Sequence, residues 1–278
     1  MTIAHRRLSA VCSLLALVGI VLAGCGGSTN STPAAVQPEI TIQTGQSFAP
    51  FILTIQPNST VKFTNKDTAA HNIKSTPATD PAFLNLEPIN LTVAAGASQT
   101  QKFTKPGVYD YYDDALGTWD TTDSRVKAND GIPTFPEAVE GIIYVQGNIS
   151  GLPATATNSV ISGKDDFEKD FVAISKGGTV SWHNNDTDKH YVQEATGWTG
   201  QINPAKIALL TIKGTADAAP DGETQTHTFD TPGLYYYFCT AHADVDTTNH
   251  RVKSHGMTAT QTAASEYPIP MEGFVLVV

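Results

Sequence analysis

The stretch that decides the fold is residues 231–242, which read TPGLYYYFCTAH. Its first three residues are a turn signal, because proline and glycine favour tight turns. The residues that follow, 234–238, are aromatic or apolar, which is typical of a buried β-strand. The sequence therefore predicts a turn, a strand, and a short segment that carries Cys239 and His242 at the end of that strand.

Other segments show the same character. Residues 51–55, 61–63 and 274–278 are short and rich in aromatic or β-branched side chains, and Gly, Pro, Asn and Asp separate such segments. Beyond the N-terminal region, no long segment carries an apolar period of 3.6 residues. This pattern predicts an all-β protein, an antiparallel sandwich with Greek-key connections.

The chain repeats itself. TVKFTN at 60–65 resembles TVSWHN at 179–184, and KPGVY at 105–109 matches TPGLY at 231–235. Two further pairs keep the order: DTTDSRVK at 120–127 with DTTNHRVK at 246–253, and EGII at 140–143 with EGFV at 272–275. Self-similarity at a period of about 120 residues indicates two domains of one fold. We predict domains at 38–147 and 159–278, joined by a polar linker at 148–158.

The N-terminus reads as a lipoprotein signal peptide, residues 1–24. Two arginines precede an apolar run at 14–22, and the sequence LAGC then ends on Cys25. We expect cleavage before Cys25 and acylation of its thiol, although an ordinary signal peptide with a chance cysteine is the alternative. Residues 25–37 form a flexible Gly/Ser/Thr/Pro-rich tether. The mature protein is then expected outside the cytoplasm, in the periplasm or at the cell surface, anchored to the membrane by lipid.

The net charge and the cysteines limit the classes of partner and site that we expect for this chain. The chain has a formal net charge of −10 at pH 7, which argues against nucleic acid and favours basic partners or simple solubility. Of three cysteines, Cys12 leaves with the signal and Cys25 takes the lipid. Cys239 is then a lone exported thiol, which is either buried and inert or a metal ligand.

The neighbours of Cys239 favour the metal ligand. His242 lies three residues beyond it, His190 lies upstream, and Met271 precedes the last predicted strand. Two imidazoles and a thiolate in a near-trigonal plane, with a weak axial thioether, are the ligands of a blue copper site. Such a site moves single electrons and performs no bond chemistry on a substrate.

The run Pro-Gly-x-Tyr-x-Tyr-x-Cys at 232–239, with its downstream histidine, resembles the cupredoxins of the plastocyanin type. Residues 38–147 resemble a second cupredoxin domain. The resemblance implies one type 1 copper ion held by His190, Cys239, His242 and Met271, with the edge of His242 facing a redox partner. It also implies a hydrogen bond from the backbone N–H of Tyr191 to the cysteine sulfur.

The second copy departs from the family in one segment. Residues 243–270 form a long loop between His242 and Met271 where small cupredoxins have a few residues. Met257 lies in this loop and is a rival axial ligand; we favour Met271 because it adjoins the last strand. The loop could cover the copper end or form a partner surface, and its histidines, His250 and His255, are expected to be solvated.

The first copy lacks the copper ligands. His71 stands where His190 does, but Asp113 replaces Cys239, Leu116 replaces His242 and Val139 replaces Met271. Without the thiolate we expect no blue copper site there, and we expect hydrogen bonds to satisfy His71. The first domain is then a degenerate cupredoxin that serves as a scaffold, spacer or docking surface.

Three classes of function compete. The first is an electron carrier whose partner is a cytochrome, oxidase or reductase, with no catalytic residue and no small-molecule substrate. The second is extracytoplasmic copper storage, delivery or sensing. The third is a multicopper oxidase or nitrite reductase, which needs His-x-His pairs or a histidine directly before the cysteine. The chain has no such pair, and Phe238 precedes Cys239, so we expect no enzyme.

Overall fold

Strands make up the regular structure of the chain. A computed structural model describes residues 36–78, 83, 86–134, 137–161, 165–196, 207, 209–218, 221–255 and 270–278. No α-helix occurs in these ranges, which confirms the prediction of an all-β protein. Among the same residues there is no helix long and apolar enough to cross a membrane.

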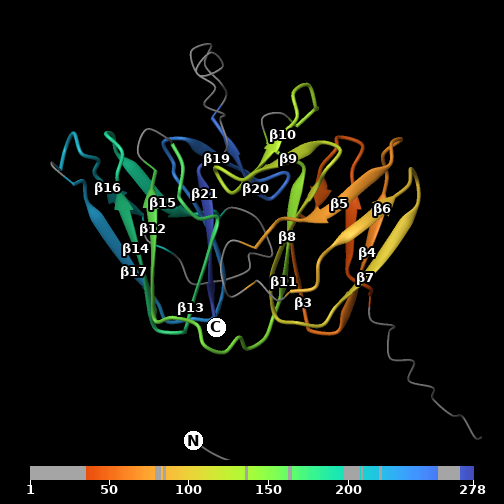
Figure 1. Cartoon of the computed structure of the whole chain (residues 1–278), viewed down its shortest axis with the longest axis horizontal. Helices are drawn as coiled ribbons and strands as arrows, with labels where there is room; N and C mark the ends of the chain where they lie inside the picture. Colours follow the sequence, from red (N-terminus) through yellow and green to blue (C-terminus); the bar gives the residue numbers. More distant parts are fainter. Residues whose placement is uncertain are drawn as a thin grey trace, which may run out of the picture. The chain divides into compact units, whose positions relative to one another are not determined.

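The first repeat forms two sheets, with strand orders β2-β1-β4-β7 and β3-β11-β8-β5-β6, and a separate hairpin, β9–β10 (Figure 1). The strands are β1 Glu39–Ile42, β2 Phe48–Ala49, β3 Ile52–Ile55, β4 Ser59–Asn65, β5 His71–Ser75, β6 Asn90–Val93, β7 Ser98–Phe103, β8 Gly107–Asp113, β9 Gly117–Asp120, β10 Arg125–Ala128 and β11 Glu140–Val145.

The second repeat has the same plan. Its sheets have the orders β12-β14-β17 and β13-β21-β18-β15-β16, and its hairpin is β19–β20. The strands are β12 Thr155–Val160, β13 Phe171–Ile174, β14 Gly178–Asn184, β15 His190–Glu194, β16 Leu210–Ile212, β17 Thr224–Phe229, β18 Gly233–Phe238, β19 Ala243–Asp246, β20 Arg251–Ser254 and β21 Glu272–Val277. The two predicted sandwiches are confirmed, whereas the exact domain limits stay a prediction.

The sheets are mixed rather than purely antiparallel. In the first repeat β1 pairs in parallel with β4, and β3 pairs in parallel with β11. The equivalent pairs β12 with β14 and β13 with β21 are also parallel. Alternating apolar patterns identify strands but do not specify the direction of their neighbours, so the sequence could not show these parallel edges.

Strand β18 is buried on both faces. Tyr235 and Tyr237 point into the core of their own sandwich, beside Trp182. Leu234 and Tyr236 belong to another cluster, which also contains side chains of the first repeat. Because successive side chains of a strand point to opposite faces, one strand lines two cores at once.

The two repeats share that second cluster. It joins Phe51 and Ile142 of the first repeat to Tyr236 and Phe274 of the second, and the rings of Phe51 and Tyr236 are 5.8 Å apart. Residues 37–278 therefore form one unit by contact, although each repeat also has its own core.

The hairpins tie the repeats together. Arg125 of β10 pairs with Asp166 at 2.6 Å and with Asp170 at 2.7 Å in the second repeat. At the equivalent position of β20, Arg251 reaches back to Glu140 of the first repeat at 3.2 Å. The segment 243–270, expected to be a loop, thus begins with a hairpin that contacts the other repeat; residues 256–269 lie outside the described part.

Candidate metal centre

Three neighbouring strands bring the predicted ligands to one end of a sheet. His190 begins β15, Cys239 follows the end of β18, and Met271 directly precedes β21. Strand β18 lies between the other two and is antiparallel to both. The end of β18 is therefore beside the beginnings of β15 and β21. A tight turn, in which the N–H of His242 donates to the carbonyl of Cys239 at 3.1 Å, returns His242 to the same place.

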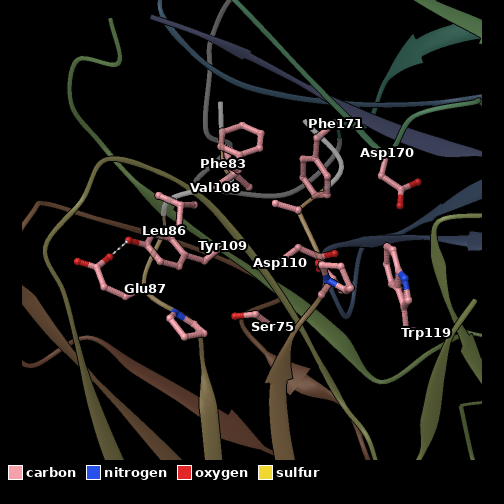
Figure 2. Close-up of a pocket in the computed structure, with 14 residues that line it drawn as sticks. Ser75, Phe83, Leu86, Glu87, Val108, Tyr109, Asp110, Trp119, Asp170 and Phe171 are labelled. Atoms are coloured by element: carbon pink, nitrogen blue, oxygen red, sulfur yellow. Dashed lines mark hydrogen bonds between the residues drawn. The ribbon is translucent and has the colours of Figure 1, made fainter. Parts of the chain in front are cut away.

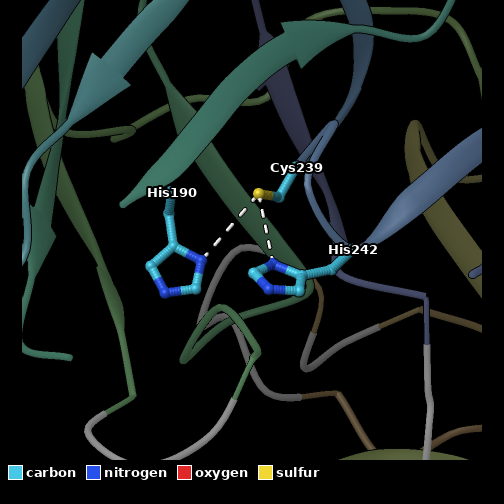
Figure 3. A group of neighbouring side chains, drawn as sticks. All are labelled: His190, Cys239 and His242. Carbon is cyan, nitrogen blue, oxygen red and sulfur yellow. Dashed lines mark hydrogen bonds between the residues drawn. The ribbon is translucent and has the colours of Figure 1, made fainter. Parts of the chain in front are cut away.

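The donor atoms of three side chains converge (Figure 3). The sulfur of Cys239 lies 3.8 Å from Nδ1 of His190 and 3.4 Å from Nδ1 of His242. A metal about 2.0–2.1 Å from nitrogen and about 2.3 Å from sulfur, the values for zinc, separates the two donors by about 3.8 Å at an angle of about 120°. The three side chains therefore fit one metal ion of that size.

The predicted axial ligand, Met271, lies next to Cys239. Its side chain is fully buried in the same core cluster as Cys239, and its carbonyl accepts a hydrogen bond from the N–H of Cys239 at 2.9 Å. Its rival, Met257, lies outside the described residues, so the choice of axial ligand stays a prediction.

The sulfur of Cys239 accepts a hydrogen bond from the backbone. The backbone N–H of Tyr191 donates to it at 3.2 Å, the contact that the resemblance implied. Burial raises the pKa of the Cys239 thiol, while the N–H groups of Tyr191, Ala241 and His242 oppose that rise. A bound cation would favour the thiolate further, because opposite charge stabilises the ionised form.

Carboxylates lie behind both imidazoles. Asp186 places Oδ2 3.3 Å from Nε2 of His190, and Asp165 places Oδ1 3.2 Å from Nε2 of His242. A third acid, Asp188, lies 3.8 Å from Nε2 of His190. None of these three acids was predicted from the sequence as part of the site. The repeated motif Asn-x-Asp-Thr-x-x-His, at 65–71 and 184–190, was the signal that could have revealed Asp186.

In the first repeat an internal ion pair replaces the thiolate site. Nδ1 of His71 contacts Asp113, and its Nε2 lies 3.2 Å from Asp67. The N–H of Asn72 donates to Asp113 at 3.2 Å, as the N–H of Tyr191 does to the sulfur. The hydrogen bond to Asp113 is the main reason that the pKa of His71 is raised. His71 is thus satisfied by hydrogen bonds, as expected.

Asp165, Asp186 and Asp188 form a second group of converging ligand atoms with His190. Across the described ranges, groups of three or more His, Cys, Asp or Glu side chains with converging ligand atoms occur only around His190. His255 instead pairs with Asp244 at 3.2 Å, and His183 contacts Thr224 across the strands at 2.8 Å. Cys25 lies outside the described residues.

Comparison with known families identifies the fold and its chemistry. The family model of copper-binding proteins, the plastocyanin/azurin family, matches residues 35–114 and 154–253. The chain belongs to this family. The second matched region contains His190, Cys239 and His242 and ends before Met271, and the two regions confirm a tandem pair of cupredoxin domains.

Solved cupredoxin structures resemble single domains of the chain. A purple cupredoxin from Nitrosopumilus maritimus is 23% identical, with a TM-score of 0.27 over 40% of this chain and 100% of its own length. A mutant of amicyanin in the reduced Cu(I) form is 17% identical, with a TM-score of 0.28 over 41% of this chain and 85% of its own.

A separate hollow of about 180 Å³ is lined by none of the proposed metal ligands (Figure 2). Aromatic and acidic side chains line it, among them Tyr109, Asp110, Trp119, Asp170 and Phe171. No histidine, cysteine or methionine is among its lining residues, so it offers none of the donors of a copper site.

Proposed function

We propose that this cupredoxin is an electron-transfer protein with a single type 1 copper ion in its second domain. The proposed ligands are His190, Cys239, His242 and Met271. The observation that supports this most is the convergence of the two Nδ1 atoms on the cysteine sulfur, at 3.8 and 3.4 Å. Soft thiolate and imidazole donors together suit copper in both oxidation states.

The bound copper would supply a one-electron couple between Cu(I) and Cu(II). The chain supplies a rigid frame for that couple. His190, Cys239 and Met271 are fully buried at strand ends, so the donors have little room to move when the charge changes. The surrounding apolar cluster keeps water away from the sulfur.

Electrons would enter and leave at His242. Its side chain is 20% exposed, whereas His190 is 0% exposed. An imidazole edge that is bound to the metal and open to solvent gives a partner close access. The net charge of −10 favours a basic face on that partner, which we expect to be a cytochrome, oxidase or reductase. Acylation of Cys25 would hold the protein at a membrane outside the cytoplasm.

The burial of the ligands also bears on the alternatives. Storage or delivery requires a metal that can be handed over, and side chains that are almost completely enclosed exchange it slowly. Reduction of oxygen or nitrite requires more histidines beside the copper. No described residue adds an imidazole to the group of His190, Cys239 and His242.

The test is a matched pair of substitutions. Cys239→Ala should abolish the intense visible absorption of the copper-loaded protein while the far-ultraviolet circular dichroism of the strands remains. Asp113→Asn changes the equivalent position of the first domain and should leave the band unchanged. A Cys239→Ala protein that keeps the band would show that the thiolate is not the ligand.

A further inference from the structure

Each copper histidine has a carboxylate on the nitrogen that faces away from the sulfur. Nε2 of His190 lies 3.3 Å from Asp186, and Nε2 of His242 lies 3.2 Å from Asp165. Because Nδ1 of each ring faces Cys239, the carboxylate and the sulfur stand on opposite sides of the imidazole. The two acids come from different segments of the chain and, with Asp188 and His190, form one cluster whose ligand atoms all lie within 4.8 Å of one another.

Asp186 is held in place by the loop that carries it. The buried side chain of Asn184 accepts the N–H of Asp186 at 2.9 Å and donates to the carbonyls of Asp188 and Ile212 at 2.8 and 2.9 Å. Oδ1 of Asp186 accepts the N–H of Thr187 at 2.7 Å, which turns Oδ2 toward the ring. The side chain of Asp186 is 7% exposed, so its charge is poorly screened.

Asp165 is positioned from the first domain. The next residue, Asp166, pairs with Arg125 at 2.6 Å, and the same arginine contacts the carbonyl of Phe167 at 3.1 Å. Arg125 thus anchors the segment that presents Asp165 to His242. The side chain of Asp165 is 45% exposed, so water and salt weaken its effect.

We propose that Asp186 and Asp165 are positioning residues of the copper site. Each accepts the Nε2–H of its histidine, which fixes the tautomer with Nδ1 free for the metal and raises the basicity of that nitrogen. A more basic donor and a nearby negative charge stabilise Cu(II) more than Cu(I). The pair therefore lowers the reduction potential, and Asp186, the buried member, has the larger effect. This inference rests on the proposed function.

The variants Asp186→Asn and Asp165→Asn remove one charge each without changing size. Loss of such a contact typically weakens metal binding by about 10–100-fold. If the loss falls on Cu(II) alone, the reduction potential rises by about 59 mV for each factor of ten. We expect Asp186→Asn to lie in this range and Asp165→Asn to shift the potential less, in the same direction.

Two control variants test whether the potential depends on the position of the carboxylate beside the histidine or only on its negative charge. Asp67→Asn alters the same motif in the first domain and should leave the potential unchanged. Asp188→Asn removes an acid 3.8 Å from Nε2 of His190 that is 62% exposed, and it should shift the potential less than Asp186→Asn. Equal shifts for Asp188→Asn and Asp186→Asn would show that net charge alone acts, which would overturn the proposal.

Nitrogen NMR of the metal-free protein gives a second measurement. Both histidines should carry their proton on Nε2 in the parent protein, and Asp186→Asn should give a mixture of tautomers at His190. If Asp186→Asn does not fold, the reduction potential of Asp165→Asn, a variant at a partly exposed position, still tests the proposal. If the reduction potential of the copper-loaded protein is the same in the parent, Asp186→Asn and Asp165→Asn, this inference is overturned. A chain that takes up no copper overturns the proposed function instead.

Discussion

One side chain distinguishes the second domain, in which we propose the copper site, from the first. Cys239 and Asp113 occupy equivalent places, and each accepts a backbone N–H from the residue after a buried histidine. In the second domain the sulfur lies 3.8 and 3.4 Å from the Nδ1 atoms of His190 and His242. In the first, the carboxylate closes on His71, so the imidazole is paired within the protein. The two repeats share one strand plan and differ at this donor atom.

The ion pair of His71 makes a prediction about pH. Asp113 and Asp67 raise the pKa of His71 above its ordinary 6.5 in the folded state. The pair should stabilise the protein fully below about pH 6.5 and lose its effect as the pH rises through the folded value. We expect urea unfolding of the metal-free protein to show this loss as the pH rises above about 6.5. The contribution of the pair is the difference between the free energies of unfolding of the parent and of His71→Gln at each pH. A difference that does not change with pH would contradict the prediction.

Met271→Leu tests the axial ligand. Leucine has a similar volume but no sulfur, so the fully buried position should stay packed while the weak axial donor is lost. The copper-loaded variant should keep its metal and its visible band but show a shifted reduction potential by voltammetry. An unchanged potential would assign the axial position to Met257 or to no side chain.

At this scale the sequence predicted the donors but not their supports. Cys239 and His242 are close in the chain, and the resemblance to cupredoxins added His190, which opens a strand. Asp165 is far from the ligands in sequence, and its segment is positioned by Arg125 of the other domain. A contact of that kind depends on tertiary structure and leaves no local pattern.

Two glycines explain why one motif recurs in both domains. A Cβ on Gly141 would lie 2.4 Å from the hydroxyl of Tyr111, and one on Gly273 would lie 2.5 Å from that of Tyr237. In each domain a tyrosine of the central strand therefore packs directly on the backbone of the last strand. This close approach leaves no room for a Cβ and explains why the Glu-Gly pair is repeated in the sequence.

Substituting these glycines gives a matched comparison. Gly141→Ala and Gly273→Ala should each lower the free energy of unfolding by about 1–3 kcal/mol through overpacking. Gly273→Ala should cost about 1 kcal/mol more, because it displaces a hydroxyl that accepts a hydrogen bond from Asn158 at 2.7 Å. The hydroxyl of Tyr111 has no such partner among the described residues. Urea unfolding measures both, and equal losses would contradict the assignment.

Element prediction succeeded where strands are amphipathic or fully apolar and missed the hairpin β19–β20. Its sequence, ADVD to RVKS, has charged residues in both strands, which is typical of a loop. The hairpin is stabilised instead by contacts outside itself. The guanidinium of Arg251 pairs with Glu140 at 3.2 Å and lies 4.9 Å from the ring centroid of Phe51.

At the scale of the molecule, the repeats predicted two domains but not a shared core. Continuous apolar strands indicate burial on both faces without indicating what covers them. The covering surface is the equivalent sheet of the other domain, joined through Phe51 and Tyr236. The first domain therefore supports the second, in which we propose the copper site, through this core and through Arg125.

Arg125 should matter for stability more than its neighbour Lys127. Removing one member of a buried ion pair typically costs about 3–5 kcal/mol, so Arg125→Ala should lower the free energy of unfolding by about that amount. Lys127→Ala, on the same strand but 28% exposed, should cost about 0–1 kcal/mol. Urea unfolding of the metal-free protein compares them. Equal losses would mean that the inter-domain pairs contribute no more than surface pairs.

The most direct test of the account is a visible and paramagnetic-resonance spectrum of the copper-loaded protein, with the metal counted per chain. The thiolate of Cys239, bound with two imidazoles, predicts an intense visible band, a type 1 resonance and one copper ion per chain. A colourless protein that takes up no copper, or a chain that binds two ions with type 1 spectra, would contradict it.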